Sequence, residues 1–99
     1  MNKPRELPIP EAALRDPKAV ELIRVWAANG KQHVSIVTGI WDDPASWGIM
    51  IVDLAKQVAN AYEQANRMSR SSALCRLKEG FDAEWDTPTD EPTGHIGER

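Results

Sequence analysis

Two side chains have the types needed for general acid–base chemistry, His33 and Asp53. A histidine that is oriented by a carboxylate can accept and donate a proton near neutral pH. The alternative interpretation is an exposed histidine beside an aspartate that pairs with Lys56 or Gln57, one helical turn further on. Nothing in their spacing brings His33 and Asp53 together. No catalytic residue is therefore predicted, and an enzyme is not expected.

A second candidate surface surrounds the dipeptide Asp43-Pro44, which is typical of a helix start. Trp41 and Trp47 flank it, and tryptophan combines a large apolar area with one hydrogen-bond donor. The two indoles would wall a pocket above the free N–H groups of the first helical turn, where an anion can bind. The alternative is that both rings pack against the helix entry. With His33 and Asp53, these residues make up the predicted ligand or partner surface.

Cys75 is the single cysteine, and Arg76 and Lys78 lie close to it. Cations near a thiol favour the reactive thiolate, so one interpretation is a redox-sensing cysteine; the other is a small apolar residue on a helix. One thiol cannot form an internal disulfide, which favours a reducing, cytoplasmic compartment. His33, Cys75 and His95 stand too far apart in the sequence to form a metal site. No metal and no cofactor is predicted.

The composition indicates one globular domain and limits its partners. The 99 residues are 41% hydrophobic and 27% charged, which excludes wholesale disorder. No apolar run approaches the roughly 20 residues that span a bilayer, so no membrane association is expected. The net charge of −3 lies in the last fourteen residues, where the four acids Asp86, Asp90, Glu91 and Glu98 outnumber the single base Arg99. A neutral body with an acidic tail lacks the basic surface that binds nucleic acid.

The periodicity of apolar residues predicts an α+β fold that is mostly helical. The expected helices span about 17–29, 44–66 and 72–85, and one short central strand spans about 32–38. The first helix would start at Asp16-Pro17 and end before Gly30. The second carries the dominant stripe of the chain, and its first half is apolar nearly all round. In domain terms, 1–15 is an extended segment, 16–86 the α+β domain and 87–99 an acidic disordered tail.

A lone strand needs a partner for its backbone hydrogen bonds. One candidate is the proline-spaced segment around Leu7 and Ile9, which would pair with it in parallel. The other is the same strand of a second subunit, across a two-fold axis. The second option also covers the spare apolar face of the 44–66 helix, and it predicts a homodimer.

The sequence resembles a family of short proteobacterial proteins that is classed as a domain of unknown function. The resemblance covers roughly residues 5–86 and rests on five phrases: Glu6–Pro10, Arg24–Ala28, Gln32–Ser35, Trp41–Gly48 and Phe81–Trp85. It implies a cytoplasmic bacterial protein with a compact domain that ends near Trp85. It implies no activity, cofactor or catalytic residue.

Two functions from different classes follow from these observations. The first is a small cytoplasmic homodimer that acts through contact with a further, unknown protein and has no chemistry of its own. The alternative is a regulatory domain that binds a small molecule or an anion at the Trp41/Trp47 helix start, with His33 beside it.

Overall fold

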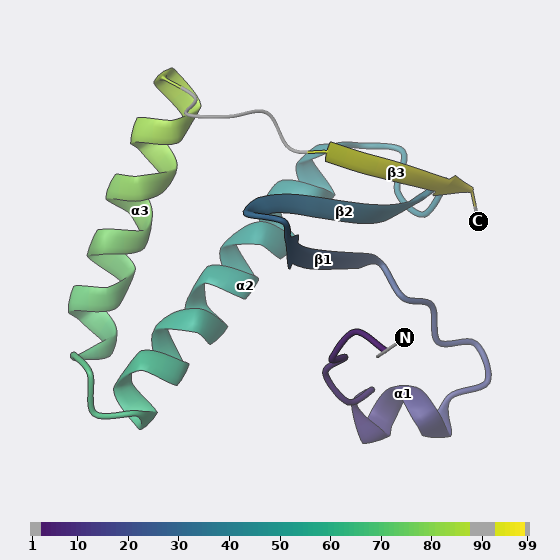
Figure 1. The fold of residues 1–99 in the computed structure, drawn as a ribbon, viewed down its shortest axis with the longest axis horizontal. Coiled ribbons are helices and arrows are strands. Elements are labelled where there is room, and N and C mark those ends of the chain that lie inside the picture. The colour runs from purple at the N-terminus through teal and green to yellow at the C-terminus, as the bar shows by residue number, and fades with distance from the viewer. Residues whose placement is uncertain (1–2, 88–92, 99) are drawn as a thin grey trace.

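The computed structural model describes residues 3–87 together with the backbone of residues 93–98, and it confirms the α+β class. Within those residues the elements follow one another as shown in Figure 1: α1 (Glu11–Arg15), β1 (Ile23–Ala28), β2 (Lys31–Thr38), α2 (Ala45–Gln64), α3 (Arg70–Asp86) and β3 (Thr93–Glu98). The predicted strand at 32–38 and the predicted helices at 44–66 and 72–85 correspond to β2, α2 and α3.

The predicted helix at 17–29 is wrong, because this stretch ends in the first strand of a β-hairpin. β1 pairs antiparallel with β2, so that Val25 lies opposite Val34 and Trp26 opposite His33. Asn29 and Gly30 join the two strands with φ angles of 54° and 72°. Positive φ at both central residues is the requirement of a type I′ turn, whose twist matches that of the strands, and Asn-Gly is its preferred sequence.

Asp16-Pro17 forms a turn instead of starting a helix. The Asp16 carboxylate accepts a hydrogen bond from the backbone N–H of Lys18 at 2.9 Å, and its carbonyl accepts one from Ala19 at 3.0 Å. The chain is extended a few residues later. At Asp43-Pro44 the same dipeptide does precede a helix, since twenty residues of helical periodicity follow it there.

The central strand β2 has a partner on each side, and neither is one of the two expected. β1 occupies one edge and β3 runs parallel to β2 along the other. The predicted disorder of 87–99 is therefore wrong for Thr93–Glu98, where hydrogen bonds to the open edge of β2 order a segment that has little apolar surface of its own. The rest of that predicted tail, apart from Thr87, lies outside the described residues.

A helical hairpin forms the second part of the fold. α2 and α3 pack at Ala59 and Ala73, whose side chains are almost completely buried. Next to this contact, Arg70 donates from Nε to Asn60 Oδ1 at 2.8 Å, and its backbone N–H donates to Glu63 Oε2 at 2.8 Å. Ser69 caps α3 by accepting from the N–H of Ser72. From this junction the two helices diverge (Figure 1).

The N-terminal segment is extended over residues 3–10 and then forms the short helix α1. The prediction of an extended chain through residue 15 is thus corrected for Glu11–Arg15, a run of good helix formers that follows the last of the three prolines. In the described part of the chain, no helix is both long and apolar enough to cross a membrane.

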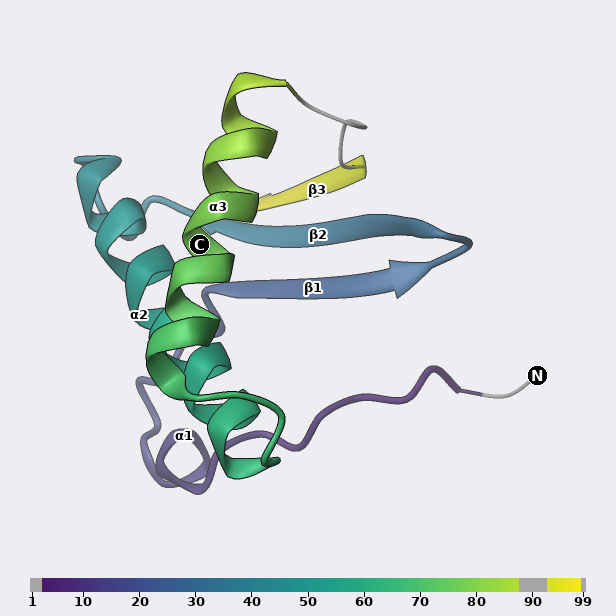
Figure 2. The same ribbon diagram turned by 90° about the vertical axis from the view of Figure 1, so that its left-hand side faces the viewer.

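The helices leave the sheet largely uncovered. Figure 2 shows the strands extending away from the helical hairpin. In the described elements, close backbone approach joins β1 to β2, β2 to β3 and α2 to α3, but no helix to a strand. The radius of gyration is 15.5 Å, whereas a compact chain of this length has about 13 Å. The protomer is therefore open, contrary to the compact domain that the resemblance implied.

Replacement of Gly30 by alanine should destabilise the protein by about 1 kcal/mol, because a Cβ atom disfavours the left-handed backbone of the turn. Gly48→Ala is the matched control. Gly48 lies inside α2 with open space around its Cα, so the same change should stabilise by up to about 1 kcal/mol. Denaturant unfolding at one protein concentration measures both. Equal effects of the two variants would contradict the hairpin.

Candidate functional site

The two tryptophans at the start of α2 contact each other. The ring centroids of Trp41 and Trp47 are 5.1 Å apart and their planes meet at 75°, an edge-to-face arrangement. Each indole thus covers part of the other where the chain enters the helix. This geometry corresponds to the helix-entry packing that the sequence offered as one of two interpretations.

The first turn of α2 already carries a negative group. Asp43 Oδ1 accepts a hydrogen bond from the backbone N–H of Ala45 at 3.0 Å, and Asp42 adds a second carboxylate next to it. A carboxylate at this position uses one of the free N–H groups and repels a second anion. The anion site predicted between Trp41 and Trp47 gains no support from this arrangement.

His33 lies away from that helix start. It is near the Asn29-Gly30 turn, and its Nε2 atom is 3.2 Å from the carbonyl oxygen of Ala28, which accepts a hydrogen bond when Nε2 carries the proton. β2 rises about 17 Å between His33 and Thr38, after which the chain turns toward Trp41. Asp53 is exposed on α2, and no hydrogen bond or ion pair in the described residues joins it to His33. The candidate residues are thus distributed over separate places.

The basic residues around α3 have partners of their own. Besides the bonds of Arg70, Arg76 pairs with Glu79 and Lys78 pairs with Asp82. The hydrogen bond and the charge of Asp82 raise the pKa of Lys78 above its ordinary value. Cys75 is exposed on the same helix. These contacts fit a solvated helix surface.

The largest unexplained feature is the apolar stripe of α2, which the chain covers only in part. It comprises the side chains at helical spacing that ought to face a core: Trp47, Ile51, Leu54 and Val58. The last three are each between 42% and 47% exposed. Stripes of this kind face a protein interior in ordinary amphipathic helices. Here the stripe stays nearly half exposed to solvent.

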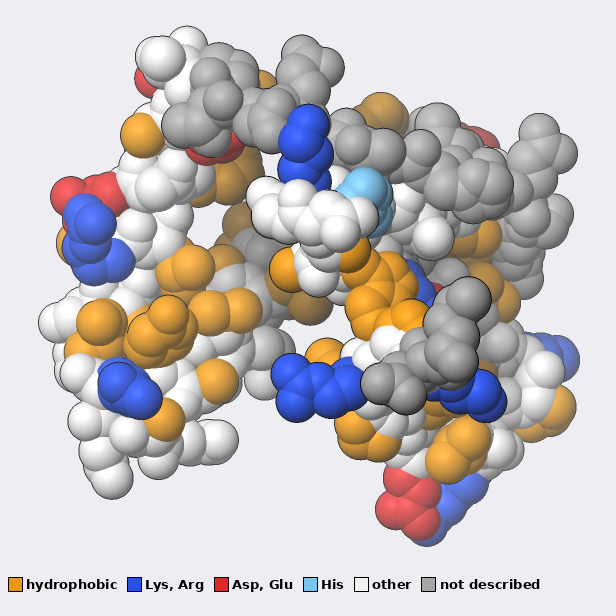
Figure 3. Space-filling model, in the orientation of Figure 1, with side chains coloured by type: hydrophobic (Ala, Val, Ile, Leu, Met, Phe, Trp, Pro, Cys, Tyr) orange, Lys and Arg blue, Asp and Glu red, His pale blue; other side chains and the backbone are white. Residues whose placement is uncertain are grey.

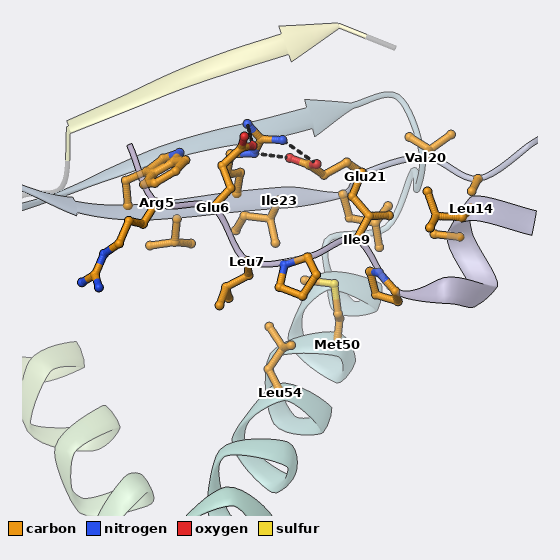
Figure 4. Close-up of a pocket in the computed structure, with 18 residues that line it drawn as sticks. Arg5, Glu6, Leu7, Ile9, Leu14, Val20, Glu21, Ile23, Met50 and Leu54 are labelled. Atoms are coloured by element: carbon orange, nitrogen blue, oxygen red, sulfur yellow. Dashed lines mark hydrogen bonds and ion pairs between the residues drawn. The ribbon is translucent and has the colours of Figure 1, made fainter. Parts of the chain in front are cut away.

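Beside this stripe, an apolar groove of about 750 Å³ separates α2 from the N-terminal segment and β1. In Figure 4, Leu7 and Ile9 of the segment lie beneath β1, and Met50 and Leu54 of α2 lie on the opposite side. Leu7 is 91% exposed although it lines the groove. Ala13 and Leu14 of α1 line it as well, so the groove is formed by the N-terminal segment, α1, β1 and α2, yet it remains open to solvent.

Arg24 of β1 links the N-terminal segment to the strand, and dashed lines in Figure 4 mark the interactions of Glu6 and Glu21. Its guanidinium binds Glu21 through two hydrogen bonds of 2.7 and 3.0 Å, and it pairs with Glu6 at 3.3 Å. The hydrogen bond and the charge of Glu21 raise the pKa of Arg24, which therefore stays charged. Arg24 thereby holds one wall of the groove.

Sequence reasoning missed the groove, because it placed β1 in a helix. Figure 3 shows hydrophobic side chains on both sides of an opening between the helical hairpin and the rest of the chain. An open apolar surface with charged residues at its margin suits contact with another protein. Two signals in the sequence pointed this way: the alternation Ile23, Val25, Ala27 and the apolar positions all round the first half of α2.

Comparison with known proteins places the fold but not an activity. Residues 6–89 match the family described as "Domain of unknown function (DUF5076)". A solved protein from the photosynthetic bacterium Rhodopseudomonas palustrus CGA009, described as a candidate pyruvate dehydrogenase, is 29% identical, with a TM-score of 0.76. The similarity covers 96% of this chain and 97% of that one. No curated protein matches the sequence.

Arg24→Ala should release the N-terminal segment while leaving the helical hairpin intact. Loss of the Glu6 contact removes the ion pair between residues 5–9 and β1, so amide hydrogen exchange of that segment should accelerate several-fold. Arg15→Ala is the matched control, since among the described residues Arg15 pairs only with Glu11, inside α1. Unchanged exchange at residues 5–9 would show that other contacts hold the segment.

Proposed function

The chain belongs to this family of unknown function, and we propose that it is a cytoplasmic homodimer that acts through protein–protein contact, without chemistry of its own. The observation that carries the proposal is the uncovered apolar stripe of α2. The groove beside it supports the same conclusion. A soluble chain that keeps this much apolar surface needs something to cover it, and a second copy is always available at the same concentration.

The exposed area supports an interface of substantial size. The protomer exposes 8923 Å², whereas a folded monomer of 11.0 kDa exposes about 5600 Å². The excess is about 3300 Å². Permanent dimers bury a total of about 2000–5000 Å² over both partners, so the excess on each protomer is large enough for one.

The buried contacts of the protomer support the proposal in a second way. In the described residues, only Ala59 and Ala73 count as buried apolar side chains. Two alanines stabilise little by comparison with the large side chains that normally form a core. Dimerisation would give α2 a proper core, and folding and association would then be coupled.

Ile51→Glu should convert the dimer to monomer. Ile51 lies on the stripe of α2. Because the dimer is symmetric, the substitution places two buried charges in the interface, one from each protomer. Loss of two isoleucine contacts, at about 1.5 kcal/mol or more each, weakens dimerisation about 100-fold or more. Light scattering of the full-length protein across a hundredfold dilution measures the change.

The matched control is Ile49→Glu, two residues away on the same helix. Ile49 is 66% exposed and points about 160° away from Ile51 around the helix axis. Its substitution should leave the mass at twice that of the protomer. A wild-type chain that stays monomeric at every concentration would refute the homodimer, and equal effects of both variants would exclude the stripe as its interface.

A further inference from the structure

Resting on the proposed homodimer, we propose how the two copies engage: the free end of α3 of one protomer inserts Phe81 and Trp85 into the apolar groove of the other, and the exchange is reciprocal. The occupant of the groove is thus the aromatic end of a second copy. Three features support this arrangement: the exposure of that helix end, the shape of the groove, and the charges next to each of them.

The inserting element is a row of side chains on one face of α3, which we call the aromatic ridge: Leu77, Phe81 and Trp85. They are spaced four residues apart, so they lie above one another on the helix. The rings of Phe81 and Trp85 stack with centroids 5.7 Å apart. Phe81 is 51% exposed and Trp85 76%. The ridge is thus ordered by its own contacts but is not covered.

The protomer does not cover the ridge because its two long helices diverge. Near the junction, Leu77 and Phe81 share a cleft with Tyr62 of α2. Trp85 lies further along α3, where α2 has moved away (Figure 1). No described residue of α3 lines the groove of its own protomer. The ridge and the groove are therefore both available to a second molecule.

The groove has the properties of a receptor for such a ridge. Its walls present aliphatic side chains from the N-terminal segment, α1, β1 and α2, and about 750 Å³ is ample for a pair of aromatic rings. Aromatic anchors in apolar pockets dominate the energies of protein interfaces. Leu54 of the stripe lines the groove and Tyr62 borders the ridge, so α2 connects the two sites along its length. In a two-fold dimer with this exchange, the apolar stripes of both α2 helices would lie next to the symmetry axis.

Charges at the two sites are complementary. Arg5 lines the groove, and Asp86 directly follows Trp85. Neither forms an ion pair or side-chain hydrogen bond in the described part of the chain. Insertion of the ridge would bring an unpaired carboxylate to an unpaired guanidinium at the margin of the interface, where such pairs help to set orientation.

Cross-linking between two different variants tests the exchange directly. In a Cys75→Ser background, Pro8→Cys marks the groove and Thr87→Cys marks the end of the ridge, and both leave Leu7, Ile9, Phe81 and Trp85 in place. The two proteins, carrying tags of different mass, are mixed and treated with a short bismaleimide. A mixed cross-link should form, whereas Lys56→Cys, on the outer face of α2, should give none with Thr87→Cys.

A second measurement separates this arrangement from the homodimer itself. Trp85→Ala should weaken dimerisation about 30-fold or more, while Ile49→Ala should not change it. A stable wild-type dimer with no mixed cross-link and no effect of Trp85→Ala would overturn the exchange and leave the homodimer standing. A wild-type monomer would overturn both.

Discussion

The rest of the structure depends on helix α2, which presents more apolar surface than the other elements of the chain cover. One flank of the helix packs on α3 at Ala59, and another borders the groove at Met50 and Leu54. Between these flanks, the strongest part of the stripe faces solvent. Each Å² of apolar area that a partner covered would contribute about 25 cal/mol to association, which is why this surface supports the proposed dimer. The same arrangement includes the open shape of the chain, the groove and the exposed C-terminal end of α3.

The elements that the sequence predicted well are those fixed by local chemistry. β2 has alternating β-branched residues, and α2 has a stripe that persists over about three turns, so neither needs information from elsewhere in the chain. The error at 17–29 arose where two local rules conflict. Asn-Gly ends helices and also forms hairpin turns, and Val20, Ile23 and Ala27 fit a helical period as well as Ile23, Val25 and Ala27 fit a strand. Pairing with β2, a longer-range contact, decided in favour of the strand.

The candidate site shows the same limit. The sequence correctly marked Trp41, Asp43 and Trp47 as neighbours, since all three lie around one helix start. The sequence could not place His33 relative to the start of α2, because that distance depends on the direction in which the β1–β2 hairpin extends from the helices. Nor could it show the groove, which requires β1, the N-terminal segment and α2 to be assembled. Arg24, whose contacts with Glu6 and Glu21 hold one wall, looks in the sequence like any other surface arginine.

The distribution of polar contacts supports association over chemistry at the groove. Groups that act on a substrate must converge, free of other partners, on a desolvated point. Around this groove, Glu6 and Glu21 both pair with Arg24, and the Glu6 contact positions the N-terminal segment. The walls below them are aliphatic, and the unpaired Arg5 lies at the margin. Apolar walls with charges at the edge are the arrangement in which burial provides the affinity and the charges provide the orientation. The same chain carries, at the end of α3, an aromatic surface of the type that such walls bind.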